Sequence, residues 1–554
     1  WNKNVNEDEV IKKLLKIINI SQKDLKNFYE EIKSNNKEFV KEILITKNLS
    51  QKDVSKLAVR SIEFPEVSFS MTKKRVYPQG IIAGHITGYV GPHSEKGSKI
   101  KPNTSWFEVG KTGLEEFFEK DLRGKFGRKR NEVTSKGHII TSQIYENTIS
   151  GNDVQTSLDM GLQAFAIERF ERGNNTVVYL KNDKIKKQID PANIINYENK
   201  DFVYKDKKNR IVNPQSGSLV VMDIENGEIL CSVSSPGYDP NIFSEGLDIK
   251  VWNSLKNNSR APFLNRSMSG IYPPGSTIKM AVALAALENG IIDYNTKFYC
   301  NGLKELGSST FHCWAKDGHG QLNLMEAIEQ SCDVYFYELG LKVGIDKIAL
   351  MMKKLGLGQY YDIEINDKSK GVVPNIEWKL KRDGLQWSMG ETLNASIGQG
   401  YLLTTPLQLT TMVSRIANGK FSVTPTLTMK KSQNRFEPLK INPKNLDFIK
   451  KSMEKVVTGI KGTAKNYKIG SRKIEMAGKT GTVQVVRISE AEREKGLIKN
   501  EDRPWKKRDH ALFVGYAPVS KPKYAITVVV EHGGSGSSVA APIARDIFKY
   551  IFKV

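Results

Sequence analysis

Ser276 and Lys279 are the residues of this 554-residue sequence whose types and spacing most directly suggest covalent chemistry. They follow a rigid Tyr-Pro-Pro-Gly turn at 272–275 and precede an apolar run, 280–287, that is typical of a buried helix. Because residues three apart share one helix face, the lysine amine can lie beside the serine hydroxyl. A serine is a weak nucleophile until a base takes its proton, and a lysine that is desolvated near other cations can be that base.

The Ser-x-x-Lys spacing alone has little specificity. The same spacing begins at five other serines, where a solvated surface is the simpler interpretation: Ser34, Ser70, Ser98, Ser452 and Ser520. The turn before Ser276 and the apolar run after it set this serine apart, although a helix-capping role remains open at this point.

Two later segments could complete an acyl-transfer site. Ser331 and Asp333 lie in 327–341, an apolar stretch that predicts a helix, where adjacent polar residues need a reason. The other segment lies in 473–486, which has the pattern of a strand, and reads Lys479-Thr480-Gly481-Thr482. Lysine and threonine on a strand can hold a substrate carboxylate, and a glycine beside them allows close approach of the backbone.

Three of the four cysteines form a separate candidate site. Cys300, Cys313 and Cys332 fall within 33 residues, and His319 lies among them. Three thiolates and an imidazole are a tetrahedral zinc set, and four protein ligands would make the metal structural. The spacings are looser than those of a zinc finger, so a disulfide between Cys300 and Cys313, or simple buried thiols, remain open alternatives.

The elements expected around these residues combine strands and helices. An Asn-Gly pair at 226–227 predicts a hairpin between strands 219–223 and 229–233, and helical patterns dominate from 277 to about 416. Strands return at 473–486, 511–516 and 524–531, before a final helix at 540–552. Strands, a helical block, more strands and a terminal helix predict an α+β fold in which helices cover a sheet.

The N-terminal part of the sequence has a different character. Helices are expected at 8–20, after Ser21 and after Ser50, followed by a strand-rich stretch at 64–90 and a short helix at 114–122. The character changes again near residue 150, and 174–213 is expected to be a polar surface insertion.

Composition excludes several classes of protein. The sequence has 39% hydrophobic and 26% charged residues, which argues against wholesale disorder, and no run approaches the ~18 apolar residues of a membrane span. The net charge of +23 suggests a nucleic-acid partner, but much of the excess lies in Lys/Asn-rich tracts at 181–187 and 205–210 without a recognition motif. We therefore expect no nucleic-acid partner and favour a basic surface that faces an anionic membrane or wall.

The order Ser-x-x-Lys, Ser-x-Asp, Lys-Thr-Gly resembles the motif set of penicillin-recognising acyl-serine transferases. From about residue 64 to the end, the chain resembles in particular the class B penicillin-binding proteins of the cell-elongation type. Segments at 84–91, 110–124, 398–400, 404–406 and 509–511 carry further parts of the resemblance. Asp333 stands where most relatives have asparagine, a departure that this subfamily shares.

The resemblance implies a fold and a reaction. Residues 1–150 would form an elongated N-terminal pedestal, a dimerisation-like domain, and 151–554 a transpeptidase domain with a five-stranded antiparallel sheet flanked by helices. The enzyme would be a serine-type peptidoglycan D,D-transpeptidase that crosslinks stem peptides at D-alanyl-D-alanine through an acyl-serine intermediate, and β-lactams would inhibit it.

The resemblance also implies roles for the candidate residues. Ser276 would attack the penultimate carbonyl with Lys279 as base, while Ser331 and Lys479, beside Asp333, would pass the proton to the leaving D-alanine. Lys479 would also bind the terminal carboxylate, together with the residues that follow it, Thr480, Gly481 and Thr482. Backbone N–H groups of Ser276 and Thr482 would stabilise the oxyanion. No cofactor is expected for catalysis.

Partners and location follow from the same resemblance. The expected partners are stem peptides, β-lactam inhibitors, a SEDS-family glycan polymerase and elongation scaffold proteins. The expected location is the inner membrane, with the catalytic domain on the periplasmic side and an N-terminal anchor that we expect to be truncated from this sequence. Alternatives that the sequence leaves open are a D,D-carboxypeptidase or β-lactamase on the same site, and a β-lactam sensor or wall-binding module without turnover.

Overall fold

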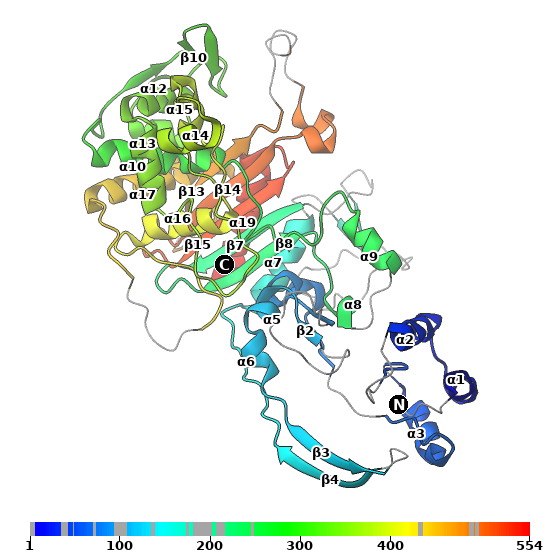
Figure 1. Cartoon of the computed structure of the whole chain (residues 1–554). Helices are drawn as coiled ribbons and strands as arrows, with labels where there is room; N and C mark the ends of the chain where they lie inside the picture. Colours follow the sequence, from blue (N-terminus) through cyan, green and yellow to red (C-terminus); the bar gives the residue numbers. More distant parts are fainter. Residues whose placement is uncertain are drawn as a thin grey trace. The chain divides into compact units, whose positions relative to one another are not determined.

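The computed structural model divides the chain into two compact units (Figure 1). It describes residues 6–34, 43–47, 49–69, 74–92, 108–134, 139–172, 177–180, 202–205, 216–244, 249–429, 436–471, 473–486, 492 and 498–554. The first unit comprises Trp1–Val76, Val90–Lys111 and Phe118–Asp153. The second comprises Tyr77–Tyr89, Thr112–Phe117 and Val154–Val554. The two units therefore interleave along the sequence, and the boundary expected near residue 150 stays a prediction.

Three helices form the core of the first unit: α1 (Glu7–Leu14), α2 (Gln22–Ser34) and α3 (Gln51–Val59). The expected start signals are confirmed, because Ser21 Oγ accepts a hydrogen bond from Asp24 N and Ser50 Oγ accepts one from Asp53 N. The three helices enclose a small apolar cluster of Ile11, Leu14, Ile17, Ile18, Ile20, Phe28, Leu57 and Phe64.

The remainder of the first unit is built from small elements. Two antiparallel strand pairs, β1 (Val90–Pro92) with β2 (Glu108–Gly110) and β3 (Arg128–Val133) with β4 (Ile139–Glu146), accompany the short helix α6 (Glu119–Arg123). Among the described residues, none of the helices combines the length and apolar character that crossing a membrane requires.

The prediction of a strand-rich stretch at 64–90 is wrong: among its described residues, only Val90, the first residue of β1, is in a strand. Most of residues 80–87 is helical instead. A 3-10 turn, η2 (Gly80–Ile82), and the one-turn helix α4 (Gly84–Thr87) occupy this part of the second unit. Ile82 and Ile86 are four residues apart and both buried, which is the spacing of a helical turn. Gly84 lies so close to the backbone of Tyr238 that a Cβ would be 2.4 Å from its carbonyl oxygen.

The segment 77–89 is held in the second unit by aromatic and polar contacts. Tyr77 N donates to Asn241 Oδ1 at 2.9 Å, and Asn241 Nδ2 donates back to Tyr77 O at 2.8 Å. The ring of Tyr89 stacks on that of Phe243 with a centroid separation of 3.7 Å. The helices α5 (Gly113–Phe117), α8 (Asn241–Ser244) and α9 (Ile249–Lys256) belong to the same unit.

The centre of the second unit is a five-stranded sheet in which every neighbouring pair is antiparallel. Its order is β13-β14-β15-β7-β8, with β7 (Ser216–Asp223), β8 (Ile229–Ser235), β13 (Ala477–Val483), β14 (His510–Ala517) and β15 (Tyr524–Glu531). The predicted α+β class and five-stranded sheet are confirmed. Because β15 pairs with β7, strands far apart in the sequence meet at the sheet's centre, and β13 is left at an edge.

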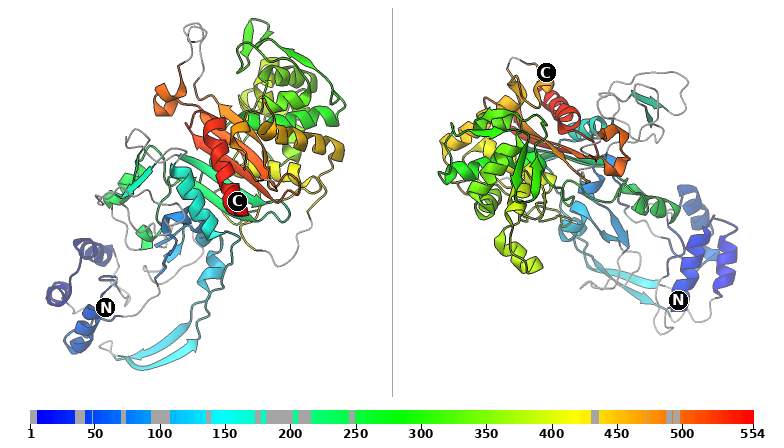
Figure 2. Two further views of the ribbon diagram at one scale, coloured as in Figure 1. Left: turned by 180° about the vertical axis from the view of Figure 1, so that it is seen from behind. Right: turned by 90° about the horizontal axis from the view of Figure 1, so that it is seen from above.

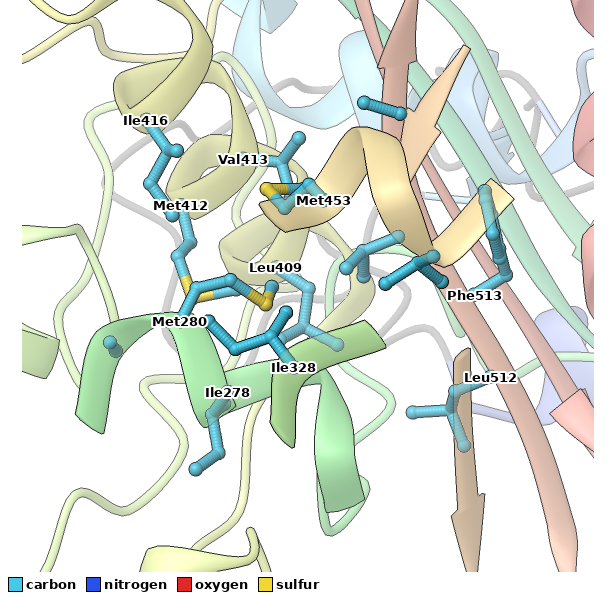
Figure 3. Close-up of a cluster of buried hydrophobic side chains, with 14 of the residues drawn as sticks. Ile278, Met280, Ile328, Leu409, Met412, Val413, Ile416, Met453, Leu512 and Phe513 are labelled. Carbon is cyan, nitrogen blue, oxygen red and sulfur yellow. The ribbon is translucent and has the colours of Figure 1, made fainter. Parts of the chain in front are cut away.

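Helices cover both faces of this sheet. The helices α7 (Met160–Arg172) and α19 (Ala541–Phe552) pack on each other and on one face, while α10 (Lys279–Glu288), α16 (Pro406–Asn418) and α17 (Pro443–Thr458) lie over the other (Figure 2). Figure 3 shows Met280 of α10, Met412 of α16, Met453 of α17 and Phe513 of β14 as members of one cluster of buried side chains. The helix α10 is apolar on every side and almost fully buried, which places it in the interior of the unit.

The helical block between 277 and 416 contains strands that the sequence pattern did not indicate. The short pairs are β9 (Phe298–Cys300) with β12 (Gly320–Leu322) and β10 (Leu303–Leu306) with β11 (Ser309–His312). Between α10 and α16, the helices of this block are α11 (Leu324–Glu329), α12 (Asp333–Val343), α13 (Ile345–Lys354), α14 (Ile376–Asp383) and α15 (Met389–Ser396). In the expected insertion 174–213, only β5 (Val177–Leu180) and β6 (Phe202–Lys205) are described; its basic tracts lie almost wholly outside the described residues.

The predicted Asn-Gly hairpin provides a test of the fold. Gly227 has φ +77°, and a Cβ on it would lie 2.0 Å from Thr424 O, whereas Gly290 has φ +63° and open space around it. We expect Gly290→Ala to lower the free energy of unfolding by about 1 kcal/mol, from backbone strain alone. We expect Gly227→Ala to lower it by about 3 kcal/mol or more, since a backbone clash adds to the strain. Denaturant unfolding measures both, and equal losses would contradict the packing of this turn.

Candidate active site

Ser276 lies on a short 3-10 turn, η4 (Gly275–Ile278), that runs directly into α10. Gly275 has φ +55°, and its N–H donates to Gly398 O at 2.8 Å. Two backbone hydrogen bonds of 2.9 Å join Tyr272 to Thr404 and hold the start of the turn. The sequence therefore delivers a half-buried Ser276 at the beginning of a rigid, buried helix.

Lys279 is fully buried at the first position of α10, and its ammonium group is surrounded by acceptors. Its Nζ donates to Asp333 Oδ1 at 2.8 Å, to Ser331 O at 2.9 Å and to Ser331 Oγ at 3.4 Å. The ring of Phe336 lies below it, 5.2 Å from Nζ to the ring centroid. Three acceptors, one of them ionised, match the three donors of a charged lysine, so this pocket is suited to a cation.

The helix predicted over 327–341 is wrong in one respect that matters for the site. The helix is interrupted at 330–332, between α11 and α12, and Ser331 has φ +58°, in the left-handed region. Such a conformation is strained for a residue with a side chain and persists only where the surroundings impose it. The break exposes the carbonyl oxygen of Ser331 to Lys279, which an uninterrupted helix would have used internally.

Lys479 approaches Ser331 from the edge strand β13. Its Nζ lies 2.8 Å from Ser331 Oγ and 3.0 Å from Thr480 O, and the residue is fully buried. Burial holds the pKa of Lys479 well below its usual range, the nearby charge of Lys279 lowers it further, and Asp333 opposes both. Ser331 Oγ thus lies between the lysine that pairs with Asp333 and a second lysine whose surroundings favour the neutral amine.

The rest of β13 lies directly against the serine turn. A Cβ at Gly481 would be 2.9 Å from Thr277 Cγ2, so glycine is what permits this approach. Thr480 is buried with its Oγ1 2.7 Å from Thr463 Oγ1, while the side chain of Thr482 is exposed and accepts a hydrogen bond from Gly536 N. The structure therefore brings together all the residues of the three sequence motifs.

The cysteines and the histidine also converge. The ligand atoms of Cys300, Cys313, His319 and Cys332, here called the Cys/His cluster, all lie within 4.8 Å of one another. His319 Nδ1 is 3.6 Å from the sulfurs of both Cys300 and Cys313, and its buried Nε2 has no hydrogen-bond partner among the described residues. All four cysteines of the chain are free thiols in the structure.

The electrostatics of the Cys/His cluster favour an ionised sulfur. A hydrogen bond from the Cys332 thiol lowers the pKa of the Cys313 thiol, and the same bond raises the pKa of Cys332. Cys332 is also the N-cap of α12, where the N–H of Tyr335 donates to its Sγ and opposes part of that rise in pKa. A cation is the charge that this pocket of sulfurs would accept.

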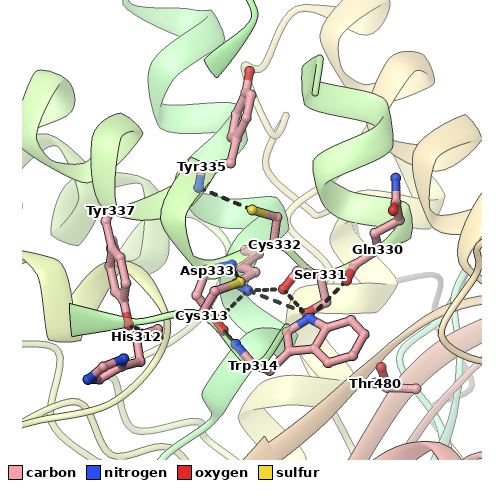
Figure 4. A network of polar contacts seen from close by, with 12 residues as sticks. His312, Cys313, Trp314, Gln330, Ser331, Cys332, Asp333, Tyr335, Tyr337 and Thr480 are labelled. Atoms are coloured by element: carbon pink, nitrogen blue, oxygen red, sulfur yellow. Dashed lines mark hydrogen bonds and ion pairs between the residues drawn. The ribbon is translucent and has the colours of Figure 1, made fainter. Parts of the chain in front are cut away.

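Two further residues contact the motifs: Thr463, which the sequence did not single out, and Trp314, which the sequence suggested only as a packing or cleft-wall residue. Thr463 contacts Thr480, but it lies in a loop between α17 and β13 where no spacing pattern marks it. Trp314 follows Cys313 directly, and its indole N–H donates to Gln330 O and Ser331 O (Figure 4). Adjacency to a candidate ligand was the one sequence signal that could have pointed to Trp314.

Two family models match the chain. One, described as the penicillin binding protein transpeptidase domain, matches residues 217–549, and the other, the penicillin-binding protein dimerisation domain, matches residues 2–156. The chain is 32% identical over 558 residues to the peptidoglycan D,D-transpeptidase MrdA of Acinetobacter baumannii. That alignment covers 98% of this chain and 75% of the relative.

Solved structures give the same result. The penicillin-binding protein 2 of Helicobacter pylori, solved in a complex with MreC, is 30% identical with a TM-score of 0.78, covering 100% of this chain and 93% of that chain. A chain from a study of polymerization and crosslinking by a peptidoglycan synthase complex is 26% identical with a TM-score of 0.69, covering 95% of this chain and 85% of that chain. Since family models match both parts of the sequence and MrdA aligns over nearly its whole length, the chain belongs to the class B penicillin-binding proteins, as a peptidoglycan D,D-transpeptidase of the penicillin-binding protein 2 type.

Proposed function

We propose that this transpeptidase crosslinks peptidoglycan stem peptides during cell elongation, through an acyl-enzyme formed on Ser276. The observation that carries the proposed chemistry is the position of Ser331 Oγ between Lys279 and Lys479. Lys279 in turn lies one helical turn after the half-buried Ser276. The elongation role rests on the similarity to MrdA and to penicillin-binding protein 2 chains.

In the proposed acylation, Ser276 Oγ forms an ester with the penultimate carbonyl of D-alanyl-D-alanine, and the peptide C–N bond breaks. Backbone N–H groups of Ser276 and Thr482 stabilise the oxyanion. The terminal D-alanine leaves with a proton. An amine of a second stem peptide then attacks the ester and releases Ser276 with its proton restored, which completes the crosslink.

Lys279 must be a neutral amine when it takes the proton of Ser276, although its pocket suits the charged form. Lys479, whose pKa is lowered, can receive that charge through Ser331 Oγ. The carboxylate of the acyl donor, bound beside Lys479, Thr480 and Thr482, favours a charged Lys479 and therefore assists the transfer. Binding of the substrate would therefore favour the neutral amine of Lys279, which is the form that acts as the base. The proton later returns through the same groups to the leaving D-alanine.

We also propose partners and a location of the kind expected from the resemblance. The similarity to a chain solved with MreC and to a chain of a peptidoglycan synthase complex supports contacts with elongation scaffold proteins and with a SEDS-family glycan polymerase. Because the site acts on stem peptides, the catalytic domain would lie on the periplasmic side of the inner membrane and would be held there by a membrane anchor.

A structural zinc ion in the Cys/His cluster is a further part of the proposal. Three thiols and one imidazole within 4.8 Å of one another are a common tetrahedral zinc set, and His319 Nδ1, 3.6 Å from two of the sulfurs, is placed to be the fourth ligand. When bound, the ion would fix the four side chains to one another and leave no position open for catalysis. Asp333 N donates to Cys313 Sγ at 3.4 Å, so the cluster directly borders the proposed active site.

The first prediction concerns covalent labelling. A labelled penicillin is expected to acylate the protein at Ser276, with the adduct mapped by peptide mass spectrometry, and Ser276→Ala is expected to take no label. Ser520→Ala, which alters a surface serine with the same spacing to a lysine, is the control and should label fully. A Ser276→Ala variant that labels as the wild type does would refute the proposed nucleophile. Rapid loss of label to water would instead support the β-lactamase alternative.

The second prediction concerns Lys479 and pH. Acylation is expected to slow as the pH falls through the lowered pKa of Lys479, because only the neutral amine can accept the proton. Lys479→Met should acylate about 100-fold more slowly or worse. Lys468→Met changes an exposed lysine and should keep the wild-type pH profile. An unchanged profile in Lys479→Met would exclude this residue from the proton path.

Stability gives an independent reading of the same group. Between the lowered pKa of Lys479 and about 10.4, the unfolded chain holds a proton that the folded chain does not, so wild-type stability is expected to rise with pH in this window. Lys479→Met should flatten the rise and Lys468→Met should keep it. Denaturant unfolding over this pH range provides the measurement.

The third prediction concerns the metal. Protein purified without a polyhistidine tag should contain about one zinc per chain by elemental mass spectrometry, and Cys300→Ala should lose it. Cys231→Ala, which changes the buried cysteine of β8 outside the cluster, is the matched control and should keep it. Zinc-free protein with a disulfide between Cys300 and Cys313 would overturn the zinc proposal.

A further inference from the structure

Trp314 has a solvent-exposed ring, but its indole N–H and its main-chain N–H both donate hydrogen bonds to other residues of the protein. It follows Cys313 just beyond β11, and 61% of its surface is exposed to solvent. An indole with this much contact with water could have its N–H solvated, yet both the side-chain and the main-chain donors bind protein acceptors beside the proposed active site (Figure 4). The position is therefore determined by what Trp314 holds rather than by burial of its ring.

The indole N–H binds the break between α11 and α12. Nε1 donates to Gln330 O at 3.1 Å and to Ser331 O at 3.2 Å. These carbonyls lie beside the left-handed Ser331, φ +58°, whose conformation needs support from its surroundings. Lys279 Nζ donates to the same Ser331 oxygen, so the strained peptide is held from two sides, by an ammonium group and by an indole.

The main-chain N–H of Trp314 binds the next residue of the motif. It donates to Asp333 Oδ2 at 3.1 Å, while Asp333 Oδ1 accepts from Lys279 at 2.8 Å. The carboxylate is thus oriented by one donor on each oxygen. Both donors of Trp314 act on groups that contact Lys279, although no hydrogen bond joins Trp314 to Lys279 among the described residues.

We propose that Trp314 is a positioning residue for acylation: its indole N–H fixes the strained backbone of Ser331, so that Ser331 Oγ stays between Lys279 and Lys479. This inference rests on the acyl transfer proposed at Ser276. Removal of the indole N–H should leave the ground-state binding of an acyl donor unchanged. It should slow the bond-forming step, because the proton path would spend less time in the aligned geometry.

Trp314→Phe tests the proposal by removing the N–H while it keeps an aromatic ring. With labelled penicillin, the first-order acylation rate constant at saturation is expected to fall about tenfold, which corresponds to about 1.4 kcal/mol. The apparent dissociation constant should stay within about twofold of the wild type. Trp314→Ala should show the same fall, because the lost donor and not the lost ring is the cause.

Trp387→Phe is the matched control, since Trp387 also donates an indole hydrogen bond, to Thr392 Oγ1 at 2.8 Å, in another part of the unit. It should acylate at the wild-type rate. The zinc content should be unchanged in Trp314→Phe, and the midpoint of thermal unfolding should fall only slightly, because one hydrogen-bond donor is lost and the ring is largely solvent-exposed.

Three results would overturn the proposal: wild-type acylation by Trp314→Phe with a loss only in Trp314→Ala, a loss carried by the dissociation constant, or a loss that accompanies release of zinc. The first two would make Trp314 a residue whose ring contacts the acyl donor, and the third would make it a support of the Cys/His cluster. Wild-type protein that takes no label at Ser276 would contradict the proposed function itself, so the two failures are distinguishable.

Discussion

The ion pair between Lys279 and Asp333 is the interaction on which the rest of the catalytic unit depends. Removing a charge from water into the interior costs several kcal/mol per ion, and loss of one partner of a buried pair costs about 3–5 kcal/mol. Lys279 has no solvent-exposed side-chain surface, and a second buried lysine, Lys479, contacts the hydroxyl of Ser331 that Lys279 also contacts. The surrounding fold must therefore supply acceptors at fixed positions, or the lysines could not remain inside.

Much of the fold meets that requirement. The break before α12 provides the carbonyl of Ser331, the start of α12 provides Asp333, and the edge strand β13 provides Lys479. Each element has a locally unfavourable feature: a serine with a left-handed backbone at the break, a largely covered carboxylate at the start of α12, and a lysine with a lowered pKa on β13. They are mutually supportive in the assembled unit, because each satisfies a donor or acceptor of another.

The sequence predicted the elements that are determined locally. The Asn-Gly hairpin, the strands that become β14 and β15 and the terminal helix follow from turn chemistry and apolar periodicity, which act over a few residues. The break at 330–332 could not be predicted, because the apolar pattern continues through it. Its contacts are with Lys279, distant in the sequence, and with Trp314, from which β12 and α11 separate it. The short strands β9–β12 were not predicted either, because each has only three or four residues, which is too short for a periodic apolar pattern.

The same distinction applies to the site. Residue types and order identified Ser276, Ser331 and Lys479 as one chemical group, since acyl transfer requires those types together. The roles of Thr463 and Trp314 depend on single hydrogen bonds made across the fold, for which a sequence has no periodic signal. Charge was a weaker guide, because a total of +23 says nothing about two lysines that are buried where their charge is restricted.

The interleaving of the two units has a consequence for what counts as the catalytic module. Residues 77–89 pack into the second unit, where Tyr77 exchanges two hydrogen bonds with Asn241 and Tyr89 stacks on Phe243. A gene fragment that begins at residue 154 therefore encodes an incomplete module: it leaves Phe243 without its stacking partner and Asn241 without its paired backbone. In evolutionary terms, a single recombination joint at residue 154 would not carry the whole catalytic unit into another protein, because residues 77–89 of that unit are encoded within the N-terminal region.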